Sequence, residues 1–168
     1  AVRLCNRRTG IGADSLIIVE KSDKADAAMR FYNQDGTEVN MSGNGLRAVA
    51  KYLFDNNVNG IADNHNPTEP TAEITVETQN GVKNLTIYKL NGKVSAVSVD
   101  MGKPEFAPEK LPTTLEAKDG KIVNVPLTVN GMNYDVTCLS VGNPHCAVFC
   151  GYLDKVNVEI IGPMFEND

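Results

Sequence analysis

The stretch NMSGNGLRA, residues 40–48, joins a turn rich in glycine and asparagine to the start of a helical pattern. Apolar residues then recur with helical spacing, at Leu46, Val49, Ala50, Leu53 and Phe54. Positions i, i+3, i+4, i+7 and i+8 lie on one side of a helix. The sequence therefore predicts a helix over residues 43–56 that buries this side in a core.

The start of this predicted helix is a candidate anion site. The first backbone N–H groups of a helix have no partner within it, and the positive end of the helix dipole adds to their attraction for a carboxylate or phosphate. Ser42 stands at this position. Two interpretations are open: Ser42 is an ordinary N-cap, or its side chain points at a bound ligand.

Length and charge limit the class of protein. The 168 residues have room for one large domain or two small ones. The formal net charge of −5 and the lack of Trp argue against binding to nucleic acid or to an anionic membrane surface. No apolar run approaches the roughly 20 residues of a membrane span, and residues 1–8 do not resemble a secretion signal. We therefore expect a cytoplasmic protein with no nucleic-acid or membrane partner.

The four cysteines are not spaced like metal ligands. Cys5, Cys138, Cys146 and Cys150 form no CxxC pair, and the chain has only two His. Zinc sites usually draw on such pairs. We therefore predict buried free thiols of the kind found in cytosolic proteins, and no metal site.

The first half of the chain is predicted to consist of strands around the helix. Residues 1–8 are predicted to be the end of a helix, and residues 9–13 a glycine loop. A turn is expected at residues 33–36 and a loop at 57–70, and the strands at residues 14–20, 27–32, 72–78, 82–90 and 93–100. The pairs Asn80-Gly81 and Asn91-Gly92 predict tight hairpins.

A domain boundary is predicted at residues 102–112, where three prolines prevent a regular helix or strand. Further strands are expected at about 121–129, 132–141 and 145–150, followed by a short helix near 152–159. We therefore expect two α+β units, residues 1–103 and 104–168, each with strands and a single buried helix.

A second polar constellation occurs in the stretch SVGNPHCAV, residues 140–148. The proline at position 144 favours an extended or turn conformation at Asn143. The apolar residues that follow place Asn143 and His145 at the entrance of a strand. Here too an ordinary interpretation is open, because a single His at a strand edge is commonly a hydrogen-bonded surface residue.

Four separated motifs, in order, resemble those of the diaminopimelate epimerase family. They are the stretches RTGIGAD at 8–14, NQDGTE at 33–38, MSGNGLR at 41–47 and GNPHC at 142–146. The resemblance covers essentially the whole chain. It implies an α+β fold of two pseudo-symmetric units, in which a curved mixed sheet wraps around a central helix, with the second unit incomplete here. It also implies a cleft between the units and no metal, pyridoxal phosphate or nicotinamide cofactor.

The resemblance further implies a reaction and a site. In the family, two cysteines exchange the α-proton of diaminopimelate on opposite faces, interconverting its LL and meso forms for lysine and cell-wall synthesis. Ser42 takes the place of the first cysteine. The family's substrate contacts fall on Ser15, Asn33, Gly43, Asn44 and Asn143, with His145 as an accessory residue. A homodimer is possible.

Two departures from the family pattern affect the expected activity. A hydroxyl is a much weaker acid than a thiol, so Ser42 is a poor proton carrier. The family's opening segment and its second cysteine motif have no counterpart in residues 1–168, so we expect a fragment of a longer protein. Three hypotheses are open: an epimerase impaired in this form, a related isomerase with another base, and a non-catalytic homologue that binds carboxylates.

Overall fold

The computed structural model describes residues 1–166, which form two compact units. The first unit is Ala1–Met101, and the second begins at Gly102. The division lies at the start of the proline-rich stretch 102–112, two residues before the expected limit between residues 103 and 104. Each unit has its own hydrophobic core cluster, so each is described by itself.

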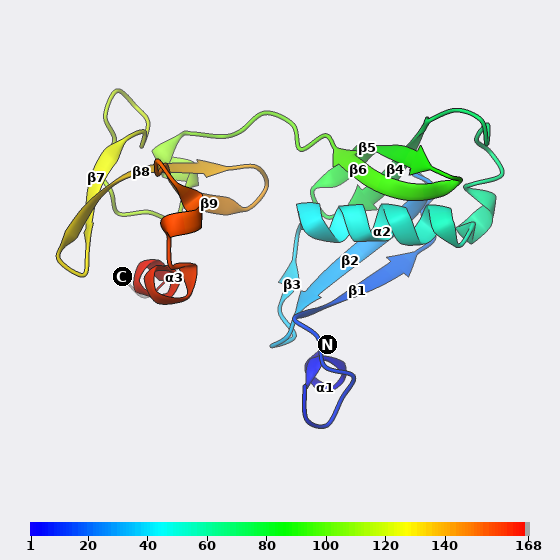
Figure 1. Cartoon of the computed structure of the whole chain (residues 1–168), viewed down its shortest axis with the longest axis horizontal. Coiled ribbons are helices and arrows are strands. Elements are labelled where there is room, and N and C mark those ends of the chain that lie inside the picture. Colours follow the sequence, from blue (N-terminus) through cyan, green and yellow to red (C-terminus); the bar gives the residue numbers. More distant parts are fainter. Residues whose placement is uncertain (167–168) are drawn as a thin grey trace. The chain divides into compact units, whose positions relative to one another are not determined.

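The first unit is a six-stranded mixed sheet that curls around one helix (Figure 1). Its strands follow the order β1-β2-β4-β5-β6, and β3 pairs with β2. β2 and β4 run parallel, while the other neighbours are antiparallel. The strands are β1 (Ser15–Glu20), β2 (Ala27–Asn33), β3 (Glu38–Val39), β4 (Thr71–Thr78), β5 (Gly81–Leu90) and β6 (Lys93–Val99). The predicted α+β fold class is confirmed.

The helix at the centre of this unit is α2 (Gly43–Asp55). The five predicted apolar positions, together with Gly45, are its buried residues. They join residues of β2, β4, β5 and β6 in one core. The helix ends where Asn57 takes a left-handed conformation, with φ of 49°, and donates its N–H to the Phe54 carbonyl. The predicted helix and its buried side are thus confirmed.

Both hairpins predicted from Asn-Gly pairs are present. Asn91 and Gly92 have φ of 53° and 76°, which matches the tight two-residue turn that links strands of right-handed twist. This turn joins β5 to β6, while Asn80 lies in the turn between β4 and β5. The register of three consecutive strands is thereby set by local sequence.

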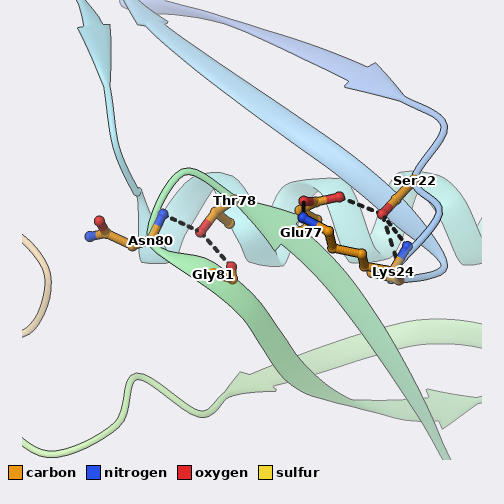
Figure 2. A network of polar contacts seen from close by, with 7 residues as sticks. Ser22, Lys24, Glu77, Thr78, Asn80 and Gly81 are labelled. Atoms are coloured by element: carbon orange, nitrogen blue, oxygen red, sulfur yellow. Dashed lines mark hydrogen bonds and ion pairs between the residues drawn. The ribbon is translucent and has the colours of Figure 1, made fainter.

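Polar side chains strengthen the short parallel contact between β2 and β4. Ser22, in the turn before β2, donates its hydroxyl to Glu77 of β4 at 2.5 Å, and Lys24 pairs with the same carboxylate at 3.3 Å (Figure 2). The carboxylate of Asp26 accepts from both the backbone N–H and the hydroxyl of Thr75. These contacts join segments about 50 residues apart in sequence.

The shorter elements of the first unit refine the predictions. The initial helix α1 is only Val2–Cys5, and the predicted loop 57–70 contains a 3-10 turn, η1 (Val58–Gly60). Gly10 lies against the carbonyls of α1, because a Cβ there would be 2.1 Å from the Arg3 oxygen. The glycine loop at residues 9–13 therefore packs its backbone directly on the helix.

The second unit contains a three-stranded antiparallel sheet in the order β7-β8-β9. Its elements are η2 (Pro108–Lys110), β7 (Val125–Val129), β8 (Met132–Ser140), β9 (Pro144–Val148), η3 (Leu153–Lys155) and α3 (Val158–Glu166). The strand predicted from residue 121 starts only at Val125. Asn124 has a positive φ of 52°, and this backbone conformation interrupts an extended strand just before Val125.

The helix predicted at residues 152–159 is wrong in position and burial. Asn157 accepts the N–H of Ile160 with its side chain at 3.2 Å, so the helix begins after it, at Val158. No residue of α3 within the described chain is buried, and Val158 and Ile160 are exposed. No helix among residues 1–166 is long and apolar enough to cross a membrane.

Candidate functional site

The first part of the candidate site is the start of α2. Ser42 is the N-cap: its Oγ accepts the N–H of Gly45 at 3.1 Å, and its carbonyl accepts the N–H of Leu46 at 2.9 Å. Within residues 1–166, no acceptor is bonded to the N–H of Gly43 or Asn44. The helix therefore presents two unpaired N–H groups at its positive end, as an anion site requires.

Close packing fixes the backbone at this helix start. A Cβ added to Gly45 would lie 3.1 Å from the Phe31 ring of β2, and one added to Gly43 would lie 3.4 Å from Met101. Because both residues are glycines, the start of the helix can lie close to the Phe31 ring of the sheet and to Met101. The Asn44 side chain is exposed and accepts a hydrogen bond from Arg47, one turn further along.

The second part of the candidate site is the facing pair Ser15 and Asn33. They are direct partners in the antiparallel pairing of β1 with β2, so the fold brings these two predicted residues together. Ser15 is half-buried and Asn33 is exposed. A cavity of about 470 Å³ adjoins Asn33 and is also lined by Asp14, Gln34 and Asp35.

Thr37 organises the turn that carries Asn33, although it was not among the predicted site residues. Its hydroxyl accepts from the Asn33 amide at 3.0 Å and donates to Asp35 at 2.6 Å. The hydrogen bonds that the Thr37 hydroxyl and the Thr37 N–H donate to Asp35 hold the pKa of the Asp35 carboxyl below its usual value. The Asp-x-Thr spacing, typical of a side-chain-closed turn, is the sequence signal that could have revealed this role.

A charged pair lies beside the same turn. Arg30 of β2 donates to both carboxylate oxygens of Glu38 in β3, at 2.8 and 3.0 Å. The hydrogen bond from Arg30 holds the pKa of the Glu38 carboxyl below its usual value. Glu38 therefore stays ionised, and its charge is matched by the guanidinium.

The third part of the candidate site lies in the second unit. Asn143 precedes β9 and His145 is within it, and the Nε2 of His145 lies 3.2 Å from the Oδ1 of Asn143. The fold brings these two predicted residues together, and His145 is exposed. Both belong to a different unit from Ser42 and Asn33, so the convergence of the three parts on one cleft stays a prediction.

The described residues offer little to a metal ion. No group of three or more His, Cys, Asp or Glu side chains within residues 1–166 could hold one. The four cysteines are free: Cys5 and Cys138 are buried, while Cys146 and Cys150 are exposed. The prediction of buried thiols is thus wrong for Cys146, which lies in the exposed part of β9, and for Cys150, which lies beyond the end of that strand.

Comparison with known proteins identifies relatives along the whole chain. The family model described as diaminopimelate epimerase matches residues 1–107. The diaminopimelate epimerase of Agathobacter rectalis is 41% identical over 172 residues, covering 99% of this chain and 57% of the relative. That of Desulfovibrio desulfuricans is 39% identical, covering 99% of this chain and 56% of the relative. The chain thus spans little more than half the length of these curated relatives.

Solved structures support the same fold at low sequence identity. A hydroxyproline epimerase from Agrobacterium vitis superposes with a TM-score of 0.56 at 16% identity, covering 90% of this chain and 37% of that one. A probable proline racemase from Agrobacterium radiobacter gives a TM-score of 0.57 at 18% identity, covering 95% and 40%. At such identities the likeness concerns the fold alone.

Proposed function

Because this chain belongs to the diaminopimelate epimerase family, we propose that it carries the carboxylate-binding half of a cofactor-independent epimerase of diaminopimelate. The observation that supports this is that the N–H groups of Gly43 and Asn44 have no acceptor among residues 1–166, at the start of a helix whose buried side anchors it in the core. A substrate α-carboxylate placed there would accept both N–H groups and would be further stabilised by the helix dipole.

The proposed binding mode gives each predicted residue a task. The backbone of Gly43 and Asn44 holds the α-carboxylate, and the amides of Asn33 and Asn143 hold the distal amino-acid end. Ser15, which faces Asn33 in the pairing of β1 with β2, contacts the substrate beside Asn33. His145 is an accessory residue that orients Asn143 through their contact of 3.2 Å.

The proposed reaction removes the α-proton from one face of the substrate and returns a proton to the other. Charge that develops on the carboxylate as the proton leaves is stabilised by donors already in place, without a cofactor. Ser42 occupies the position of a proton carrier in this scheme. Since an alkoxide is far less accessible than a thiolate, we propose that turnover is impaired in this form.

One observation favours a second candidate, a homologue that binds carboxylates without catalysis. The Ser42 hydroxyl is already engaged as the N-cap acceptor of Gly45. That role is complete without any proton transfer. A related isomerase in which another residue is the base is the remaining candidate. Loss of the substrate α-proton in deuterated water separates both catalytic candidates from the binding homologue.

The binding proposal is tested by titrating the ¹⁵N-labelled chain with meso-diaminopimelate and following its amide signals. The signals of Gly43 and Asn44 are expected to move most, because their N–H groups gain an acceptor. Asn44→Ala, which keeps the backbone N–H, should retain binding, whereas Asn33→Ala should weaken it. Unmoved signals at both amides with millimolar ligand would contradict the proposal. Lysine, which keeps the α-carboxylate but lacks the distal one, should move the same two signals at a higher concentration. Cadaverine, which has no carboxylate, is the matched control ligand and should leave them unmoved.

We also propose that the protein works in the cytoplasm as a homodimer. The four free thiols suit a reducing compartment. Light scattering on the purified protein tests the oligomeric state, and cell fractionation tests the location.

A further inference from the structure

Two cysteines of the second unit face each other across neighbouring strands. Cys138 of β8 and Cys146 of β9 are direct partners in the antiparallel register. The N–H of Cys138 donates at 2.9 Å to the Ile122 carbonyl, away from β9. In a hydrogen-bonded pair this N–H would instead point to the partner residue. Cys138 and Cys146 therefore form a non-hydrogen-bonded pair.

This class of pair brings side chains close enough for a covalent link. Its Cα atoms are about 4.5 Å apart, within the range of about 4.4–6.8 Å in which disulfides form. Both side chains line one cavity of about 220 Å³. Neither strand needs to move far for the sulfurs to bond.

The two thiols differ in their access to solvent. Cys138 is 7% exposed, whereas Cys146 belongs to the exposed residues of β9. Burial raises the pKa of the Cys146 thiol, and the adjoining Cys138 thiol raises it further. Because Cys146 is exposed and Cys138 is buried, an oxidant reaches Cys146 first, and Cys138 lies behind it as the partner thiol. The raised pKa keeps most of Cys146 protonated at neutral pH, so its reaction with peroxide should be faster at higher pH.

We propose that Cys138 and Cys146 are a redox modification site that closes to an intramolecular disulfide when the protein meets a peroxide. The Cys146 thiolate attacks a peroxide oxygen, the O–O bond breaks, and Cys146 becomes a sulfenic acid with release of water. The Cys138 sulfur then attacks the Cys146 sulfur, and the hydroxyl leaves as a second water. Two thiols lose two electrons and two protons, and one hydrogen peroxide is reduced to two waters.

The disulfide would join β8 to β9, the two strands on either side of the hairpin turn. This turn contains Gly142, with φ of 109°, and Asn143. The link is independent of the substrate proposal, since it requires only the two strands. A reducing thiol reverses it by thiol–disulfide exchange.

The test treats the reduced 168-residue chain with hydrogen peroxide, blocks the remaining thiols, and digests the denatured protein with chymotrypsin. Cleavage after Tyr134, Leu139 and Phe149 places the three cysteines of this unit on separate peptides. Mass spectrometry should then show peptide 135–139 joined to peptide 140–149, and reduction should separate them. A stable sulfinic acid on Cys146 without any joined peptides would overturn the proposal.

Two exposed cysteines provide matched variants. Cys150→Ser should leave the joined peptides at their original yield, because Cys150 lies beyond the end of β9. Cys146→Ser should abolish them, with circular dichroism showing that both variants stay folded. If Cys146→Ser instead joins peptide 135–139 to the peptide that carries Cys150, then Cys150 is a competing partner and the proposed pair is wrong. Loss of the joined peptides in Cys150→Ser would contradict the proposed pair as well.

Discussion

At the scale of single residues, Ser42 combines a structural role with a position of chemical interest. Its hydroxyl satisfies the Gly45 N–H, one of the otherwise free donors of the first helical turn. The N–H groups of Gly43 and Asn44, nearer the start of the helix, have no acceptor in the part of the chain that the structure describes. The cap and the anion site therefore share one turn of chain without competing for the same N–H groups.

The capping role leads to a prediction about stability. Ser42→Ala removes the acceptor for Gly45, and we expect a loss of about 1 kcal/mol in the free energy of unfolding. Urea denaturation followed by circular dichroism measures it. Ser42→Asp restores a capping acceptor and should recover the loss. Equal stability of Ser42→Ala and the parent chain would show that the cap contributes nothing.

The chemical role leads to a separate prediction. Ser42→Cys, made in a form of the protein that carries the family's second cysteine, should raise the rate of α-proton exchange by about 10²–10⁴-fold, since it restores a competent general base. The readout is the α-proton signal of each diaminopimelate stereoisomer by NMR in deuterated water. Equal rates in both proteins would point to another base. If neither protein exchanges the proton but both bind, the binding homologue is favoured.

At the scale of elements, the end of α2 is fastened to β6 by polar contacts. The Asp55 carboxylate accepts the backbone N–H of Val94 at 3.0 Å and pairs with Lys51 at 2.7 Å, and Lys51 also donates to the Val94 carbonyl at 2.8 Å. Both backbone groups of a buried strand residue are thus satisfied by the helix. The packing of helix on sheet therefore has a polar component beside its apolar one.

This connection makes α2 and β6 sensitive to Asp55. Asp55→Ala leaves the Val94 N–H unpaired, and we expect a loss of about 1–3 kcal/mol in the free energy of unfolding at neutral pH. Asp23→Ala is the matched control, because no residue within 1–166 bonds to the exposed Asp23 carboxylate. Urea denaturation of both variants measures the difference. A similar loss in both would contradict the assigned role.

The Asp55 contribution should also depend on pH. Burial opposes ionisation, but the hydrogen bonds from Lys51 and Val94 prevail and hold the pKa of the Asp55 carboxyl below its usual value. The stabilisation is thus present above the ordinary pKa of about 3.9 and is lost as pH falls through the lower folded value. The stability gap between the parent chain and Asp55→Ala should therefore narrow below about pH 4.

At the scale of the whole molecule, the two units differ in how much apolar surface each encloses. The core cluster of the first unit contains residues from α2 and four strands of the sheet. That of the second unit, among the described residues, centres on Leu111, Ile122 and Cys138. Burial of apolar area is the main favourable term in folding. The larger buried core of the first unit therefore stabilises its fold far more than the small core of the second unit does.

We therefore predict that residues 1–101 fold alone, while residues 102–168 do not. The isolated first unit should give a cooperative thermal transition and dispersed amide signals by NMR. The isolated second unit should give the far-ultraviolet circular dichroism of an unfolded chain. An unfolded first unit would show that it depends on the rest of the protein.

The sequence by itself determined those features that depend on neighbours along the chain. The spacing from Leu46 to Phe54 set the buried side of α2, and the Asn-Gly pairs set the hairpin turns, because each acts within a few residues. The four motifs identified the family for the same reason, because each is a short run of neighbouring residues that can be recognised without knowing the fold.

Only the tertiary structure decided the contacts between distant segments. The parallel pairing of Ala27 with Val76, the role of Lys51 and Asp55 at β6, and the facing of Cys138 by Cys146 depend on strand register. The start of β7 and the exposure of α3 also differed from expectation. Local propensity is weak against long-range packing, so the sequence does not specify which segments meet until the core brings them together.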